Sequence, residues 1–408
     1  MGGPLATKYG RLPAMRATTL PFVVGPLASA LATNISVMCF GRLLSGIGAG
    51  ASTVICPLYI AEICPRDKKG LYGASTQVMI NVGILLAQIL GYFLSYGNIW
   101  RMILAVSGLI GALELIGLHF VPESPKWLAD NANMAMVREV LRKIRRESEV
   151  EAEIAGTYPI SHRNQDDDEK KDWKSLAGHE HEPLLGGHVT TEIEPPHEPS
   201  VTLIDAIRVS KCRRAVIAVV AAMIAQQATG INSVIMYSVA ILGAIMPSAA
   251  ALITVMVSGL NMVVTLACAP LADKIGRKTC LLASIVGMGM SSFLLALAMI
   301  YNLGFLSVIA TFSFVASFGV GLGPVPFILA SELVGPEGVE ATQCWGLAAC
   351  WTATFCVAQF FPVLNAALPN GNVFWVFVGI AILIGSFIAW WLPESKGKVS
   401  AAEVWADA

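Results

Sequence analysis

The feature that most constrains this chain is a series of long stretches without a charged residue. Thr279 to Ile300 gives 22 such residues in a row, and Phe305 to Ser331 gives 27. About 20 apolar residues in a helix cross the ~30 Å hydrocarbon core of a bilayer. These stretches lack the polar face that a helix of a soluble protein turns to water. The sequence therefore predicts an all-α polytopic membrane protein.

Ten complete spans are predicted from the uncharged stretches: 16–33, 36–60, 71–95, 101–121, 214–242, 249–271, 279–300, 305–331, 342–366 and 373–392. Lysine and arginine fall in alternate loops, which hold 25 of the 27 basic residues, 14 of them in 122–214. Because these residues concentrate on the cytosolic side of a membrane, the 122–214 loop and the C-terminus are predicted to be cytosolic.

Three motifs occur twice, in the same order and at nearly one spacing, which indicates two parallel repeats related by an axis along the membrane normal. Pro4–Arg11 recurs 266 residues later as Pro270–Arg277, with six of eight positions identical. Glu62 recurs 270 residues later as Glu332, and Pro122-Glu123-Ser124 recurs 271 residues later as Pro393-Glu394-Ser395.

The repeat also predicts an incomplete first half. In the second half, the helix 214–242 precedes the Pro270 motif and the helix 249–271 ends in it. In the first half, only three residues precede the corresponding Pro4 motif. We expect the first helix and most of the second to be missing, and a truncated gene model, a splice form or a naturally short protein would each explain this. The predicted domains are an incomplete bundle (1–128), a cytosolic linker (129–212), a six-helix bundle (213–392) and a cytosolic tail (393–408).

The linker has two parts. Val137, Val140, Leu141 and Ile144 form one face of a predicted basic amphipathic helix. From residue 147 to residue 200 there are 14 acidic and 4 basic residues. Such a segment has too little apolar surface to fold alone, so it is predicted to be disordered.

Charge and cysteine content exclude other function classes. The net charge of −1 offers no basic surface for nucleic acid, and the nine cysteines form no CxxC pair that would indicate zinc or a disulfide framework. No nucleophile–base or metal-binding constellation occurs. We therefore expect neither an enzyme nor a cofactor nor a bound metal.

Together, several motifs resemble the sugar porter family of the major facilitator superfamily, to which the glucose transporters belong. They lie between Gly2 and Lys398 and are Gly41-Arg42, Pro57–Glu62, Pro122–Leu128, Gln226–Asn232, Asp273–Lys278, Gly323–Pro326 and Pro393–Gly397. The residues of these motifs are also similar to those of fungal sugar porters linked to vacuolar protein sorting. The resemblance implies the major facilitator fold and transport of a sugar by alternating access, in the vacuolar or plasma membrane. A non-transporting sugar sensor or trafficking factor on the same fold is the alternative.

A sugar hydroxyl both donates and accepts hydrogen bonds, and a neutral amide does the same without burying a charge. The intramembrane amides are Gln77, Gln88, Gln226, Gln227, Asn232 and Asn261. Each could equally join helices. The resemblance favours five of them, all but Gln88, as sugar ligands, and adds Phe327 and Trp351 as aromatic residues that cover a sugar face.

Two helix breaks are predicted. Gln227 and Asn232 are five residues apart, or ~140° around a regular helix, so they can meet one ligand only if the helix bends near Gly230. A second helix is interrupted by Gly323, Pro324 and Pro326, since each proline lacks an amide donor. This segment is predicted to be a hinge.

Charged residues repeat at the predicted cytosolic helix ends, where ion pairs could latch one conformation; solvated helix ends are the alternative. They are Arg11, Glu62, Glu123, Asp273, Arg277, Glu332 and Glu394. Thr7 stands where the family has an acid, which is expected to weaken the latch. Arg42 lies inside a span, and in proton-coupled relatives the arginine at this position pairs with an aspartate of the first helix. Proton coupling is therefore left open.

Glu180, Leu184 and Leu185 resemble an acidic dileucine signal that vesicle-coat adaptors read on proteins bound for vacuoles or lysosomes. Replacing both leucines, Leu184→Ala with Leu185→Ala, is expected to move a tagged protein to the plasma membrane. Fluorescence microscopy measures this redistribution. Vacuolar staining that does not change would contradict the signal.

Overall fold

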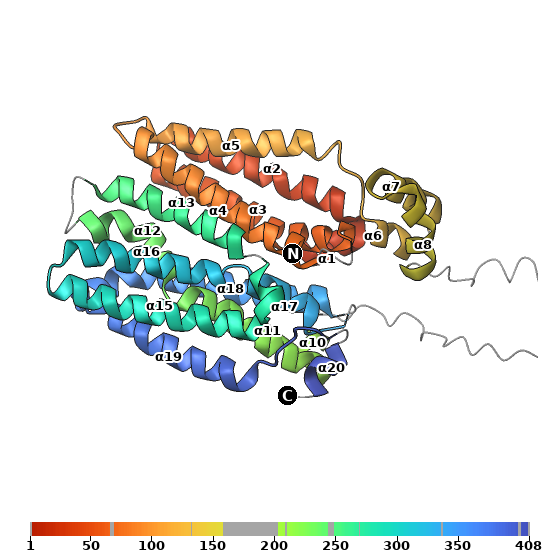
Figure 1. Cartoon of the computed structure of the whole chain (residues 1–408). Coiled ribbons are helices and arrows are strands. Elements are labelled where there is room, and N and C mark those ends of the chain that lie inside the picture. Colours follow the sequence, from red (N-terminus) through yellow and green to blue (C-terminus); the bar gives the residue numbers. More distant parts are fainter. Residues whose placement is uncertain are drawn as a thin grey trace, which may run out of the picture. The chain divides into compact units, whose positions relative to one another are not determined.

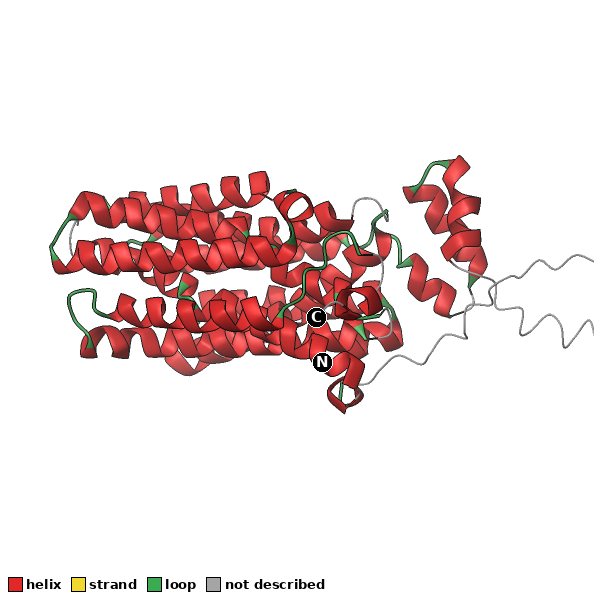
Figure 2. Ribbon diagram, turned by 60° about the horizontal axis from the view of Figure 1, so that its bottom comes forward, coloured by secondary structure: helices red, strands yellow, loops and turns green. Residues whose placement is uncertain are grey.

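The computed structural model describes residues 2–65, 69–131, 133–157, 203–208, 210–243, 249–268, 270–335, 338–398 and 401–406. The described part divides into two units: unit 1 comprises Met1–Val121 and Ser200–Ala408, and unit 2 comprises Pro122–Pro199. Secondary structure in these ranges is helical throughout (Figure 2). Nine helices among them are long and apolar enough to span a membrane. The prediction of an all-α polytopic protein is therefore confirmed.

The first half of unit 1 holds α1 to α5 (Figure 1). Their bounds are α1 Gly2–Tyr9, α2 Arg11–Ala30, α3 Ile35–Ile63, α4 Lys69–Leu94 and α5 Trp100–Gly117. The helix α2 packs on α3 and α5. It coincides with the predicted span 16–33 but is not among the nine spans, because two arginines and several polar residues lower its mean hydropathy.

The second half of unit 1 holds α10 to α20. Their bounds are α10 Asp205–Arg208, α11 Ser210–Ala228, α12 Ile231–Gly243, α13 Ala250–Cys268, α14 Leu271–Ile275, α15 Arg277–Ile300, α16 Gly304–Val320, α17 Val325–Glu332, α18 Val339–Ala367, α19 Val373–Trp391 and α20 Ala401–Ala406. Within this half α15 packs on α16 and α19, and α11 packs on α18. The two halves meet chiefly where α4 packs against α13 (Figure 1).

The sequence repeat is visible as a repeated helix break. The short helices α1 and α14 are each followed by a glycine, Gly10 or Gly276, and then by a long helix. Both glycines have extended backbone at positive φ, with φ 101° and ψ 158° in Gly10 and φ 105° and ψ 151° in Gly276. This region is essentially restricted to glycine.

Unit 2 contains α6 Pro125–Asp130, α7 Met134–Ile144 and α8 Glu147–Thr157. The predicted amphipathic helix is α7. The prediction of disorder from residue 147 onward was wrong for its first part, which is α8. Val150 and Ile154, four residues apart, are buried with the apolar side of α7, and Arg145 pairs with Glu153 at 2.7 Å. Residues 158–199, with Glu180, Leu184 and Leu185, lie outside the described residues.

Replacing Gly276→Ala is expected to destabilise the protein. An alanine in this backbone region costs about 1–3 kcal/mol, and its Cβ would overlap the Glu394 carboxylate. The measurement is the midpoint of thermal unfolding in detergent. Gly397→Ala is the control, since its φ is also positive, at 77°, but no neighbour lies within 4 Å of its Cβ. A midpoint that falls no further for Gly276→Ala than for Gly397→Ala would contradict the overlap.

Candidate functional site

A cavity of about 260 Å³ lies within unit 1 and is lined by residues of both halves. All seven residues predicted to contact a sugar line it: Gln77, Gln226, Gln227, Asn232, Asn261, Phe327 and Trp351. Four polar lining residues were missed by the sequence reasoning: Thr53, Asn81, Cys350 and Thr354. The structure therefore brings together side chains that are up to 301 positions apart in the sequence.

A larger cavity, of about 520 Å³, lies between α13 and α16 and has a different character. Its lining is apolar except for Ser313. A ligand rich in hydroxyl groups would find too few hydrogen-bonding partners there, so the chemistry of this cavity suits a lipid chain and not a polar solute.

Asn81 is the centre of a buried hydrogen-bond network that joins the two halves. Its Oδ1 accepts from Gln77 Nε2 at 3.1 Å and from Asn261 Nδ2 at 3.2 Å, and its Nδ2 donates to Thr265 Oγ1 at 2.9 Å. All four side chains are at least 95% buried. The spacing of four residues, which puts Gln77 and Asn81 on one helix face, is the signal that could have identified Asn81.

Gln227 and Asn232, which also line the cavity, meet across the bend between α11 and α12. The Asn232 Nδ2 donates to Gln227 Oε1 at 2.6 Å. Gly230 separates the two helices with a φ of 99°, so the chain turns between the two side chains as their convergence requires. Gln227 Nε2 donates in turn to Gln226 Oε1 at 3.0 Å and lies 3.2 Å from Cys350 Sγ.

The aromatic residues lie on the second half. Phe327 is in the first turns of α17, and Trp351 on α18 donates from Nε1 to Thr53 Oγ1 of α3 at 3.4 Å. Trp351 is 47% exposed and lines the cavity. Gln88 lines neither cavity and donates to the Ile235 carbonyl at 3.4 Å, a helix-to-helix contact.

The predicted hinge is a tight turn between α16 and α17, and three of its backbone N–H groups donate hydrogen bonds. Gly323 N donates to Phe318 O at 2.9 Å, and Val325 N donates to Gly321 O at 3.0 Å. Leu322 N donates to Ser284 Oγ of α15 at 3.1 Å. A buried backbone N–H without a partner would destabilise the fold, so these bonds permit an irregular turn inside the bundle.

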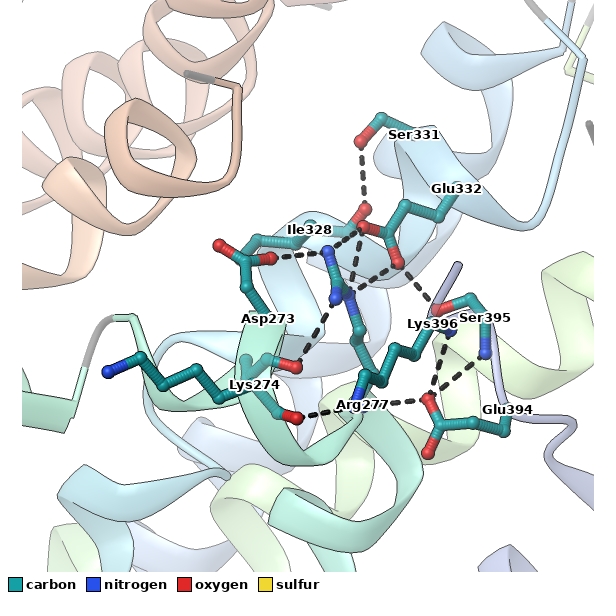
Figure 3. A network of polar contacts seen from close by, with 10 residues as sticks. Asp273, Lys274, Arg277, Ile328, Ser331, Glu332, Glu394, Ser395 and Lys396 are labelled. Atoms are coloured by element: carbon teal, nitrogen blue, oxygen red, sulfur yellow. Dashed lines mark hydrogen bonds and ion pairs between the residues drawn. The ribbon is translucent and has the colours of Figure 1, made fainter. Parts of the chain in front are cut away.

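Each half carries its own ion pair at one end of unit 1, the charged end. In the first half Arg11 binds Glu62 through two bonds of 2.6 and 2.8 Å. In the second half Arg277 binds Glu332 at 2.8 Å and Asp273 at 2.6 Å (Figure 3). These pairs connect helix ends within a half, so they are not the contacts that join the halves.

Glu394 acts as a cap in the same cluster. It accepts from the backbone N–H of Arg277 at 2.8 Å, while Ser395 Oγ donates to Glu332 at 2.6 Å (Figure 3). Its repeat counterpart Glu123 lies in unit 2, where it accepts from Ser124 N at 2.8 Å.

A polar contact between the halves at the charged end comes from Thr7. Its hydroxyl lies 2.7 and 2.8 Å from the two carboxylate oxygens of Glu340, at the start of α18. The repeat counterpart of Thr7, Asp273, instead binds Arg277 of its own half. The residue that breaks the family pattern therefore forms a bond that an aspartate, which repels a carboxylate, would not form.

Arg42, Glu114 and His119 lie within predicted spans. Arg42 is exposed on α3, and no ion pair or hydrogen bond of its side chain is found in the part of the chain that the structure describes. His119 Nδ1 lies 2.8 Å from the Leu115 carbonyl, a local contact one helical turn away. Glu114 is half-buried on α5 next to Thr19.

The family profile described as sugar (and other) transporter matches residues 1–191 and 192–402. A probable metabolite transport protein of Saccharomyces cerevisiae is 33% identical over 404 residues, 99% of this chain and 78% of the relative. The glucose transporter GlcP of Staphylococcus epidermidis is 29% identical, over 97% of this chain and 82% of the relative.

Vacuolar protein sorting-associated protein 73 of S. cerevisiae is 32% identical, over 96% of this chain and 76% of that protein. Among solved structures, the proton:xylose symporter XylE bound to 6-bromo-6-deoxy-D-glucose superposes with a TM-score of 0.76 at 24% identity. The match covers 98% of this chain and 84% of XylE. The fold is therefore that of the major facilitator superfamily, as predicted.

Replacing Asn81→Leu is expected to destabilise unit 1, because leucine has a similar shape but leaves three buried polar side chains without their shared partner. Each such loss costs about 1–3 kcal/mol. The midpoint of thermal unfolding measures it. Gln88→Leu, which removes one long, half-exposed bond, is the control. Equal midpoints for the two variants would contradict the central position of Asn81 in the network.

Proposed function

This chain belongs to the sugar (and other) transporter family, and we propose on that premise that it carries a hexose or a related carbohydrate across a membrane by alternating access. The observation that supports this most is the cavity of about 260 Å³ with side-chain amides from both halves in its walls. Sites for drug-sized ligands begin at about 300 Å³, so this cavity suits a solute of monosaccharide size.

The polar groups of the cavity match the chemistry of a sugar. Gln77, Asn261, Gln227 and Asn232 line the cavity from four different helices, and every amide offers both donors and an acceptor. Phe327 and Trp351 add the aromatic surface that a sugar ring prefers for its C–H face. A glucose transporter among the relatives, and a hexose analogue bound to the structural neighbour XylE, support the same substrate class.

Alternating access needs two bodies that rock against each other around a central site. The ion pairs Arg11–Glu62 and Arg277–Glu332 fix helix ends within each half, so we propose that each half moves as one body. The Asn81 network and the Thr7–Glu340 bond cross between the halves. We propose that these crossing bonds break and re-form during transport.

We also propose an orientation, a membrane, a sorting partner and a second substrate for this protein. The charged end of unit 1 faces the cytosol, as the distribution of lysine and arginine suggests. The vacuolar or plasma membrane is the site of action, a choice supported by the vacuolar sorting relative. A vesicle-coat adaptor reads Glu180, Leu184 and Leu185. Protons are a candidate second substrate, since XylE is a proton:xylose symporter.

The test is uptake of radiolabelled D-glucose and D-xylose into proteoliposomes that contain the full chain, with and without a protonophore. We expect saturable uptake, and Asn232→Leu is expected to raise KM about tenfold, which corresponds to about 1.4 kcal/mol of lost binding. Ser386→Ala, which removes an exposed hydroxyl that bonds to the Ile382 carbonyl within α19, is the control and should leave KM unchanged.

Two outcomes would count against this function or refine it. Correctly inserted protein that takes up neither these sugars nor any polyol tested would contradict transport and favour a sugar sensor on the same fold. Uptake that persists with the protonophore would contradict proton coupling while leaving sugar transport intact.

A further inference from the structure

Two adjacent glutamines of identical chemistry have different partners. Gln227 bonds to side chains of the cavity, namely Asn232 and Gln226. Gln226 instead donates from Nε2 to two backbone carbonyls, Leu322 O at 2.8 Å and Gly323 O at 2.9 Å. Its side chain is 2% exposed. Both amide hydrogens of Gln226 are thus committed to the turn between α16 and α17, and only its oxygen is directed to the cavity residues.

The sequence explains why one of these carbonyls, that of Leu322, needs an outside donor. In an uninterrupted helix the carbonyl of Leu322 would accept from the backbone N–H four residues later. That residue is Pro326, which has no N–H. Leu322 is fully buried, so water cannot take the place of the missing donor. Gln226 supplies it from α11, 96 positions away in the sequence.

The position of the turn matters for the cavity. The helix α17 begins directly after it and carries Phe327 into the cavity wall. Gln226 Oε1 accepts from Gln227 Nε2, the same donor that a ligand hydroxyl would use. A ligand bound to Gln227 competes for this donor and so acts on the side chain that holds the turn.

We propose that Gln226 is a positioning residue. It fixes the break between α16 and α17 to α11 and connects ligand binding at Gln227 to the movement of α17, while Gln227 binds the sugar. This inference rests on the proposed function for its transport consequence. The bond from Gln226 to the turn is independent of transport and can be tested without a substrate.

The first experiment compares hydrogen–deuterium exchange in Gln226→Met and Gln227→Met, two variants that keep the length of the side chain and remove its donors. The full chain is used in lipid nanodiscs without sugar. Gln226→Met is expected to increase exchange of the backbone amides in residues 321–327 about tenfold, because the turn opens more often. Gln227→Met should leave these amides within about twofold of the unchanged protein.

The second experiment measures D-glucose uptake for the same pair. We expect Gln226→Met to lower the maximal rate at least tenfold with KM within about threefold. We expect the opposite for Gln227→Met, a KM raised at least tenfold with a nearly unchanged maximal rate. A purely structural residue would reduce the amount of inserted protein without this split between rate and KM.

Equal exchange in the two variants would overturn the inference, and so would a Gln226→Met variant that raises KM as much as Gln227→Met does. If Gln226→Met does not fold, Gln226→Asn keeps an amide that is one methylene too short to reach both carbonyls, and should give the same pattern to a smaller degree. If the unchanged chain takes up no sugar, the proposed function fails, while the exchange measurement still decides whether Gln226 holds the turn.

Discussion

The structure depends on one requirement: inside a membrane every backbone polar group needs a partner within the protein. Regular helices meet it, yet a polar cavity needs a chain that departs from regular helix. This chain departs at Gly230 and at the turn between α16 and α17. Ser284 and Gln226 bind the backbone groups that the second departure leaves without helical partners. Of these two side chains, Gln226 also forms part of the wall of the cavity.

The amides of the cavity are bonded to one another. Asn81 binds partners on α4 and α13, and Gln227 binds Asn232. A sugar must replace these bonds, each of which contributes about 0.5–1.5 kcal/mol net. Because the sugar replaces one set of hydrogen bonds with a similar set, the affinity of the cavity for the sugar is moderate. This suits a carrier, which must release its substrate on the other side.

The ion pairs lie at different places in the structure from the hydrogen bonds of the amides. The pairs Arg11–Glu62 and Arg277–Glu332 each stay within one half and are largely buried. Separating such a pair would leave a buried charge without its partner, which costs several kcal/mol. Bonds between the halves instead use neutral groups or one carboxylate with a hydroxyl, as at Thr7 and Glu340. The strong interactions hold each half together, and the weaker ones are those that we propose to separate when the halves move.

The sequence by itself determined nine of the ten predicted membrane spans, the repeat, the family resemblance and the seven predicted residues that line the cavity, because hydropathy, spacing and motifs are local properties of the chain. It did not reveal the helix α8, whose acidic residues are offset by apolar contacts and ion pairs with α7. Only the tertiary structure decided which amides meet. The network around Asn81 and the bond from Gln226 to Leu322 join helices far apart in sequence, and no local pattern encodes a hydrogen bond whose two partners are brought together by folding.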